Sequence, residues 1–207
     1  MLFGCAAPED LFPDWGARPV EVEIGPGRGA FALDHAALHL DRLLVAIEAR
    51  RADCELIRGR AARRGLSNLE VLQGDAKLLL PRIFRPGSLA AVHVQFPDPW
   101  WKTRHHKRRM IDVELAALLR RLLLPGGQVD FRTDVPAYFR EAVQTWLEAG
   151  FGQLPEARPE VLSTRERRYA ITGQPVFRAA FENPAGADLS PIKSDRTGRD
   201  WRDIRRK

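Results

Sequence analysis

Short apolar runs alternate with longer segments of helical periodicity along this chain, and this alternation restricts the possible folds more than any other feature. Strands that alternate with helices are typical of βαβ units around a parallel sheet. The first five expected strands cover residues 20–24, 43–47, 69–72, 89–94 and 128–132. The expected helices cover residues 31–40, 54–64, 77–84, 111–124 and 136–149. The pattern predicts an α/β fold, with a mostly parallel sheet and helices on both of its faces.

The C-terminal part of the chain departs from this alternation. Apolar segments around residues 159–162 and 176–181 have the size of an antiparallel hairpin at the sheet edge, which brings the expected sheet to seven strands. From residue 183 onward the composition turns to Pro, Gly, Asp and Arg. We therefore expect one domain over residues 1–182 and a basic, flexible tail over residues 183–207, which could grip RNA or serve only solubility.

Composition and charge narrow the class of protein. A length of 207 residues is enough for one full hydrophobic core, and a net charge of +6 is compatible with a polyanionic partner. Cys5 and Cys54 offer neither a disulfide framework nor the spacing of metal ligands. No apolar run reaches transmembrane length. We expect a cytoplasmic protein that acts away from membranes and holds no metal ion.

A glycine loop follows the first expected strand. Gly25, Gly27 and Gly29 let the backbone turn tightly and approach a ligand that side chains would block. Such a loop fits either a nicotinamide dinucleotide or S-adenosylmethionine. Glu23 precedes the glycines, where it would repel a pyrophosphate but attract a sulfonium or ammonium group. The loop therefore favours S-adenosylmethionine.

Two further acids follow the next two expected strands. Glu48, at the end of the second strand, could bind the ribose hydroxyls of either cofactor. Asp75, after the third strand, could bind the amino group of an adenine. Both acids support a nucleoside-containing cofactor.

An acidic tip and a cationic, aromatic loop follow the fourth expected strand. Pro97 and Pro99 restrict φ on both sides of Asp98 and remove two amide donors, so the carboxylate is held where the strand ends. Open α/β sheets bind ligands outside the carboxyl ends of their strands, which makes Asp98 the expected substrate-facing acid. Five cations and no acid follow within ten residues, a composition suited to phosphates: Lys102, Arg104, Lys107, Arg108 and Arg109. Trp100 and Trp101 could stack on a base or wall the pocket.

Over about residues 20–181, and most specifically over residues 96–109, the chain resembles the tRNA (guanine-N7)-methyltransferases of the TrmB type. The resemblance implies a Rossmann-like class I methyltransferase fold and S-adenosyl-L-methionine as the cofactor. It implies methylation of N7 of a guanine in tRNA, at position 46 of the variable loop. By position, the cofactor-binding residues are Glu23, Gly25, Gly27, Gly29, Glu48, Asp75 and Asp98.

The resemblance also implies substrate-binding residues. Lys102 matches a substrate-binding lysine, and Asp134 matches a substrate-binding acid after the fifth strand. The family's Thr-Lys-Phe-Glu element corresponds to Ser163, Thr164, Arg165 and Glu166, which keep the hydroxyl and the acid but lose the lysine and the aromatic ring. Tyr169 stands where the family usually has a glycine soon after this element.

The expected chemistry requires no strong base. Guanine N7 has an exposed lone pair and carries no proton, so methyl transfer depends on in-line placement and on recognition of the base. Asp98 can accept hydrogen bonds from the ring N1–H or the exocyclic amine and can offset the charge that N7 alkylation places on the purine. We expect Asp98 to be the catalytic residue, with RNA phosphates contacted by Arg104, Lys107, Arg108 and Arg109.

Other functions stay open on the residues alone. A related methyltransferase could act on another nucleobase or on an amide, and a non-catalytic relative could bind RNA only. A nicotinamide-dependent enzyme would also fit the glycine loop. Which tRNAs are modified, and whether the protein is a monomer or a homodimer, also stays open.

Overall fold

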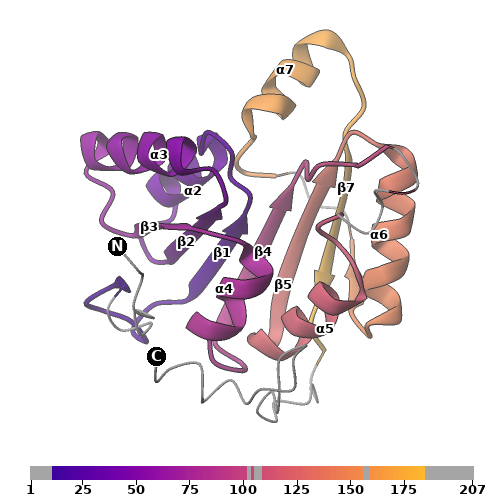
Figure 1. The fold of residues 1–207 in the computed structure, drawn as a ribbon, viewed down its shortest axis with the longest axis horizontal. Coiled ribbons are helices and arrows are strands. Elements are labelled where there is room, and N and C mark those ends of the chain that lie inside the picture. The colour runs from indigo at the N-terminus through magenta and orange to yellow at the C-terminus, as the bar shows by residue number, and fades with distance from the viewer. Residues whose placement is uncertain (1–10, 102–103, 105–108, 156–158, 185–207) are drawn as a thin grey trace.

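The computed structural model describes residues 11–101, 104, 109–155 and 159–184 of the chain. Its centre is a seven-stranded sheet in the order β3-β2-β1-β4-β5-β7-β6 (Figure 1). Strands β1 to β5 are parallel, and β7 is antiparallel to both of its neighbours, β5 and β6. The strands are β1 (Val20–Ile24), β2 (Leu43–Glu48), β3 (Leu69–Gln73), β4 (Leu89–Gln95), β5 (Leu123–Thr133), β6 (Gly152–Leu154) and β7 (Phe177–Glu182). The expected mostly parallel sheet with an antiparallel C-terminal edge is confirmed.

Helices cover both faces of the sheet, as expected. They are α2 (Ala30–Leu38), α3 (Arg51–Arg64), α4 (Ala76–Ile83), α5 (Val113–Leu122), α6 (Pro136–Glu148) and α7 (Thr164–Thr172). Alternate residues of each strand point to opposite faces. Leu43, Val45 and Ile47 therefore join the core under α4, α5 and α6, whereas Leu44 and Ala46 join the core under α2 and α3.

The strand order reverses between β1 and β4. The chain runs outward from β1 through β2 to β3 and then returns to pair β4 with the other side of β1. In doubly wound sheets, ligands bind in the crevice outside the carboxyl ends of the strands at such a reversal. Helix α7 lies beyond this end of the sheet, near the ends of β4 and β5 (Figure 1). The fold thus places the candidate site between the loops after β1 and β4.

Two sequence expectations at the C-terminal half are wrong. The helix expected over residues 111–124 ends earlier, since α5 stops at Leu122. Pro125, Gly126 and Gly127, residues typical of a turn, lie inside β5 and not between a helix and a strand. Gly126 and Gly127 exchange backbone hydrogen bonds with Asn183 at 2.8 Å, so long-range pairing incorporates a sequence that locally signals a turn.

The second error concerns the first strand of the terminal hairpin, whose antiparallel pairing at the sheet edge is confirmed. Residues 159–162 form no strand, and β7 pairs with the short β6 instead. Helix α7 fills the connection between them and has one buried residue, Glu166. A three-residue edge strand and a helix with a polar surface carry no apolar periodicity, which explains why the sequence pattern missed both. Over the described residues, no helix combines the length and apolar character needed to cross a membrane.

Candidate functional site

Glu48 connects the glycine loop after β1 to the residues after β2 through two hydrogen bonds. The Glu48 carboxylate accepts a hydrogen bond from the Gly27 amide at 2.9 Å with one oxygen and from the Arg50 amide at 2.9 Å with the other. Gly25 and Gly27 have φ of +69° and +55°, a region that disfavours other residues. A Cβ added at either glycine would meet no atom within 4 Å, so the loop borders open space. The loop can therefore approach a ligand closely.

Gly29 serves a different purpose from the other two glycines. A Cβ on Gly29 would lie 2.5 Å from Cγ1 of Ile57 on α3. The residue also has a φ of +75° and is the N-cap of α2. Its small size lets α2 start against α3, so the structure supports a packing role for Gly29 and shows no ligand-facing space there.

Glu23 is a buried carboxyl group directly below this loop. The residue is 2% exposed, and its Oε2 has no hydrogen-bond partner among the described residues. Burial raises the pKa of Glu23 to about 8, against the opposing influence of His93 and Arg132. A buried carboxyl oxygen without a partner is suited to a cationic ligand group.

Asp75 lies at the carboxyl end of β3, in the same row of loops. It is the N-cap of α4 and accepts a hydrogen bond from the Lys77 amide at 2.8 Å. The residue is exposed, so its carboxylate keeps room for a second partner. Glu23 thus lies one residue before the end of β1, Glu48 ends β2 and Asp75 follows β3, positions that the sequence pattern predicted.

The acidic tip after β4 is conformationally strained. Phe96 and Trp100, which bracket Pro97-Asp98-Pro99, have φ of +49° and +46°. Positive φ is costly for bulky residues and persists where surrounding contacts impose it. The Phe96 amide donates to the Arg132 carbonyl at 2.7 Å, and Asp98 is exposed. The tip therefore presents one carboxylate to solvent from a rigid turn.

Arg109 anchors the other side of this tip. Its Nε donates to the Pro99 carbonyl at 2.8 Å, its guanidinium pairs with Glu141, and its Cζ lies 4.8 Å from the centre of the Tyr138 ring. We expected Arg109 to contact RNA phosphates, but the residue is 7% exposed. The structure instead supports a role for Arg109 in positioning the tip.

Of the four other cationic residues in the loop after Asp98, the structure describes one. Arg104 is exposed. Lys102, Lys107 and Arg108 lie outside the described residues, as does the tail from residue 185. Their expected contacts with RNA, and the proposed division into domain and tail, stay predictions.

The Ser163–Glu166 element is the start of α7. Ser163 Oγ accepts from the Glu166 amide at 3.3 Å, and Glu166 Oε2 accepts from the Ser163 amide at 2.9 Å, which is a capping box. Glu166 also accepts from Arg132 at 2.9 Å and from Arg178 at 3.0 Å, and it is 2% exposed. Glu166, which the resemblance assigns to substrate binding, already has its carboxylate bound by protein groups, whereas Thr164 and Arg165 are exposed.

Asp134, Arg165 and Tyr169 meet the tip at the ends of β4 and β5. Tyr169 Oη donates to Asp134 Oδ2 at 2.6 Å, and Arg165 lies 3.6 Å from the other carboxylate oxygen. The Tyr169 ring contacts the Phe96 ring edge-on, with centroids 6.3 Å apart. Arg165 lies over the same Phe96 ring at 5.2 Å. These contacts connect α7, the residue after β5 and the acidic tip after β4. In the sequence, only the family resemblance related Asp134 and α7 to the site.

A buried polar network crosses the sheet beneath this site. Glu21 accepts hydrogen bonds involving His35 at 2.7 Å and His93 at 3.0 Å. His93 lies 3.6 Å from Asp130, which binds Arg132 at 2.6 Å. Arg132 continues the network to Glu166 of α7, as described above. Sequence reasoning missed this network, although alternating polar residues in expected buried strands were a visible signal.

Contacts within the network lower the pKa of Glu21 and raise the pKa of His93, so both side chains favour their charged forms. Burial alone would raise the pKa of Glu21, but its hydrogen bonds with His35 and His93 hold that pKa far below its usual range. Burial opposes the charged form of His93, yet Asp130 and Glu21 raise its pKa to about 9. The ligand atoms of Glu21, His35 and His93 lie within 4.8 Å of one another and could hold a metal ion. Hydrogen bonds already account for that convergence, so the expected absence of a metal stays a prediction.

Comparisons with known proteins agree with this geometry. A family model described as "Putative methyltransferase" matches residues 17–179. Over 182 residues, the chain is 54% identical to a protein of Anaeromyxobacter dehalogenans named tRNA (guanine-N(7)-)-methyltransferase, a match that covers 82% of this chain and 90% of that protein. A protein of the same name from Myxococcus xanthus is 44% identical over 185 residues, covering 84% and 90% of the two chains.

Solved structures share the fold. The crystal structure of the aminoglycoside resistance methyltransferase NpmB1 matches with a TM-score of 0.63 at 22% identity, covering 85% of this chain and 93% of that one. The 16S rRNA methyltransferase KamB matches with a TM-score of 0.62 at 20% identity, covering 84% and 91%. The chain therefore has the Rossmann-like class I methyltransferase fold.

Proposed function

The chain belongs to the tRNA (guanine-N7)-methyltransferase family, and from this premise we propose that it transfers a methyl group from S-adenosyl-L-methionine to N7 of a guanine in tRNA. One observation carries the proposal. Ile24 of β1 pairs with Val94 of β4, so the glycine loop and the Asp98 tip leave the sheet side by side. A cofactor held by the first loop would lie next to a base held by the second.

The residues around the glycine loop fit S-adenosyl-L-methionine. The unpaired Glu23 carboxyl lies where a cationic group would satisfy it, and Gly25 and Gly27 border open space. Glu48 uses one lone pair of each oxygen on backbone amides, which leaves acceptor capacity for ribose hydroxyls. Asp75 is the exposed acid for the adenine amino group. When bound, the cofactor supplies an electrophilic methyl group.

Asp98 would orient the guanine and stabilise the charge that develops on it. The N7 lone pair attacks without losing a proton, so no side chain has to act as a base. As the methyl group is transferred, the purine becomes cationic, and a nearby carboxylate lowers the energy of that state. The strained turn between Phe96 and Trp100 holds this carboxylate in place before the substrate arrives.

Substrate contacts would come from the exposed side chains around the tip. Asp134 and Arg165 already lie together at the end of β5, and Thr164 is exposed beside them. The cationic composition of the loop after Asp98 supports phosphate contacts by Arg104, Lys107 and Arg108. The resemblance adds Lys102 as a substrate-binding lysine. We further propose position 46 of the variable loop as the target, as the family resemblance implies. We propose the cytoplasm as the place of action, because the relatives' name states tRNA as the substrate.

The test is methyl transfer from labelled S-adenosyl-L-methionine into unmodified tRNA, followed by borohydride and aniline, which cleave at 7-methylguanosine. Cleavage at guanine 46 would support the proposal. Label without cleavage would mean a different target atom and would contradict it. Binding of NAD in place of S-adenosylhomocysteine would exclude methyl transfer altogether.

A further inference from the structure

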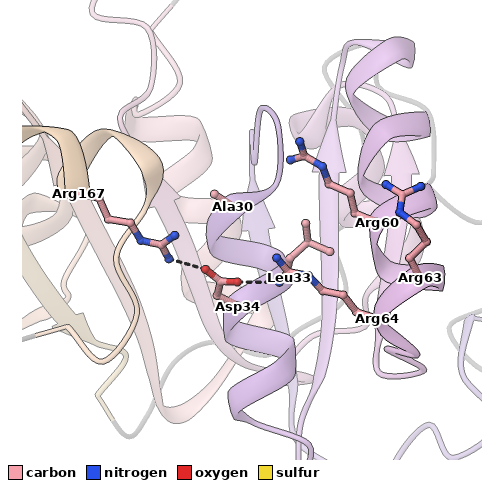
Figure 2. A pocket seen from close by; sticks show the side chains of 7 residues that line it. All are labelled: Ala30, Leu33, Asp34, Arg60, Arg63, Arg64 and Arg167. Atoms are coloured by element: carbon pink, nitrogen blue, oxygen red, sulfur yellow. Dashed lines mark hydrogen bonds and ion pairs between the residues drawn. The ribbon is translucent and has the colours of Figure 1, made fainter.

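A cavity of about 400 Å³ lies between α2, α3 and α7 (Figure 2). Its lining is Ala30, Leu33, Asp34, Arg60, Arg63, Arg64 and Arg167. Helix α2 contributes Ala30, Leu33 and Asp34, whereas the guanidinium groups come from α3 and α7. None of these residues belongs to the glycine loop or to the acidic tip.

The lining carries four guanidinium groups and one carboxylate, an excess of three positive charges. Asp34 binds Arg64 at 2.7 Å and also pairs with Arg167, whose side chain is half exposed (Figure 2). Arg60 donates to the Arg28 carbonyl at 3.2 Å. Arg63 is exposed and has no ion-pair or hydrogen-bond partner among the residues that the structure describes. The cavity thus has more donors than its own acceptors can satisfy.

The cavity connects with the candidate site through two elements. Ala30 directly follows Gly29 of the glycine loop. Helix α7 contributes Arg167 to the cavity while its Arg165 and Tyr169 contact Phe96 and Asp134 at the tip. A ligand that spans α7 would therefore touch both the tip and the cavity.

We propose that this arginine-rich cavity binds backbone phosphates of the substrate tRNA, next to the segment that carries the target guanine. Guanidinium groups bind phosphate oxygens through paired, charge-assisted hydrogen bonds, and four of them around an open cavity suit a chain of phosphates. The inference rests on the proposed function, since it takes tRNA as the source of the phosphates. A free phosphate ion shares the same chemistry, and the experiment separates the two sources.

Arg63→Gln removes one cation from the cavity, and Arg82→Gln is its matched control. Arg82 is exposed, likewise has no partner among the described residues, and lies near the end of α4, on the opposite face of the sheet. Both variants lower the net charge by one. The measurement is the dissociation constant of unmodified tRNA over a series of salt concentrations, with S-adenosylhomocysteine binding as a check on the cofactor site.

We expect Arg63→Gln to weaken tRNA binding on the order of 5-fold near physiological salt and to reduce the salt slope by about 1, as for one lost phosphate contact. Arg60→Gln with Arg63→Gln should reduce the slope by about 2. Arg82→Gln should leave the slope unchanged. Equal slopes for Arg63→Gln and Arg82→Gln would overturn the proposal.

Asp34→Asn supplies a test of opposite sign. Asp34 competes with phosphate for Arg64 and Arg167, so its neutralisation should tighten tRNA binding if the cavity holds RNA. Weaker tRNA binding in this variant would show that the ion pairs serve only to hold α7, and would count against the proposal.

Inorganic phosphate distinguishes the two ligand sources. If phosphate binding falls in the Arg60→Gln, Arg63→Gln double variant while tRNA binding does not, the cavity takes a free anion and the RNA assignment is wrong. Formation of 7-methylguanosine by the unaltered protein is scored in the same preparations. If only the cavity proposal is wrong, the unaltered protein still forms 7-methylguanosine. If the proposed function is wrong, no sample contains 7-methylguanosine.

Discussion

The Tyr169 hydroxyl donates a hydrogen bond to Asp134 Oδ2 at 2.6 Å, which ties α7 to the end of β5. The same ring meets Phe96, the first residue of the acidic tip, edge-on. A glycine, which the resembling family usually has near this position, could make neither contact. In this chain, the helix that carries the diverged Ser163–Glu166 element is therefore fastened directly to the proposed catalytic loop.

Tyr169→Phe should test this connection. The variant keeps the ring contact with Phe96 but removes the hydrogen bond, so Asp134 loses a fixed orientation. We expect KM for tRNA to rise about 3- to 10-fold, as for one lost hydrogen bond of ordinary strength, with S-adenosylhomocysteine binding unchanged. Thr172→Val is the control, because it removes an exposed hydroxyl that bonds only within the same helix. Equal KM values for both variants would leave Tyr169 without a role in the site.

Asp98→Ala should lower kcat on the order of 100-fold or more, because it removes one preorganised charge-stabilising group. Asp98→Asn should recover part of the loss if orientation of the base matters, since an amide oxygen still accepts hydrogen bonds. Single-turnover methyl transfer at saturating tRNA measures the effect. Near-normal turnover of Asp98→Ala would contradict the catalytic assignment.

Cofactor binding should depend on pH through Glu23. Its pKa of about 8 means that the free protein holds a neutral carboxyl group at pH 6 to 7, whereas a cationic ligand favours the carboxylate. Binding of S-adenosylhomocysteine should therefore release a proton and strengthen as pH rises toward 8, then level off. Calorimetry in buffers of different ionisation enthalpy measures that proton. Glu23→Gln should abolish both the proton release and the pH slope; a slope that persists in this variant would assign it to another group.

Folding stability should fall at alkaline pH through His93. The pKa of this histidine rises from 6.5 to about 9 on folding, so its contribution is complete below pH 6.5 and is lost as pH rises through 9. We expect this group to lower the free energy of unfolding by about 3 kcal/mol across this range. Glu23, with a pKa raised from 4.5 to about 8, also loses stability as pH rises, but mainly below pH 8.

His93→Gln separates these two groups in urea denaturation series. The variant should remove the loss of stability above pH 8 and reduce its slope between pH 6.5 and 8, whereas Glu23→Gln should remove the loss below pH 6.5 and keep the loss above pH 8. A wild-type profile that is flat between pH 7 and pH 9.5 would contradict the assignment of His93 as a buried cation.

The local pattern of the sequence was sufficient for most of the fold. The strand expected over residues 20–24 is β1 without change, and the helix expected over residues 136–149 is α6 to within one residue. Side-chain periodicity and turn chemistry act over neighbouring residues, so they can be seen without the tertiary structure. The order of acids along the chain also sufficed to place Glu23, Glu48 and Asp75 at the carboxyl ends of the strands, because parallel strands end on the same side of the sheet.

Only the tertiary structure decided which polar residues are occupied by the protein and which stay open to a ligand. Glu166 and Arg109 look like site residues in the sequence, yet Glu166 is taken by Arg132 and Arg178, and Arg109 by Pro99 and Glu141. The pairing of Gly126 with Asn183 overrode a local turn signal in the same way. Each of these outcomes depends on contacts between residues far apart in the chain. Burial then fixes whether a charge is satisfied internally or free to bind, a property that no local pattern contains.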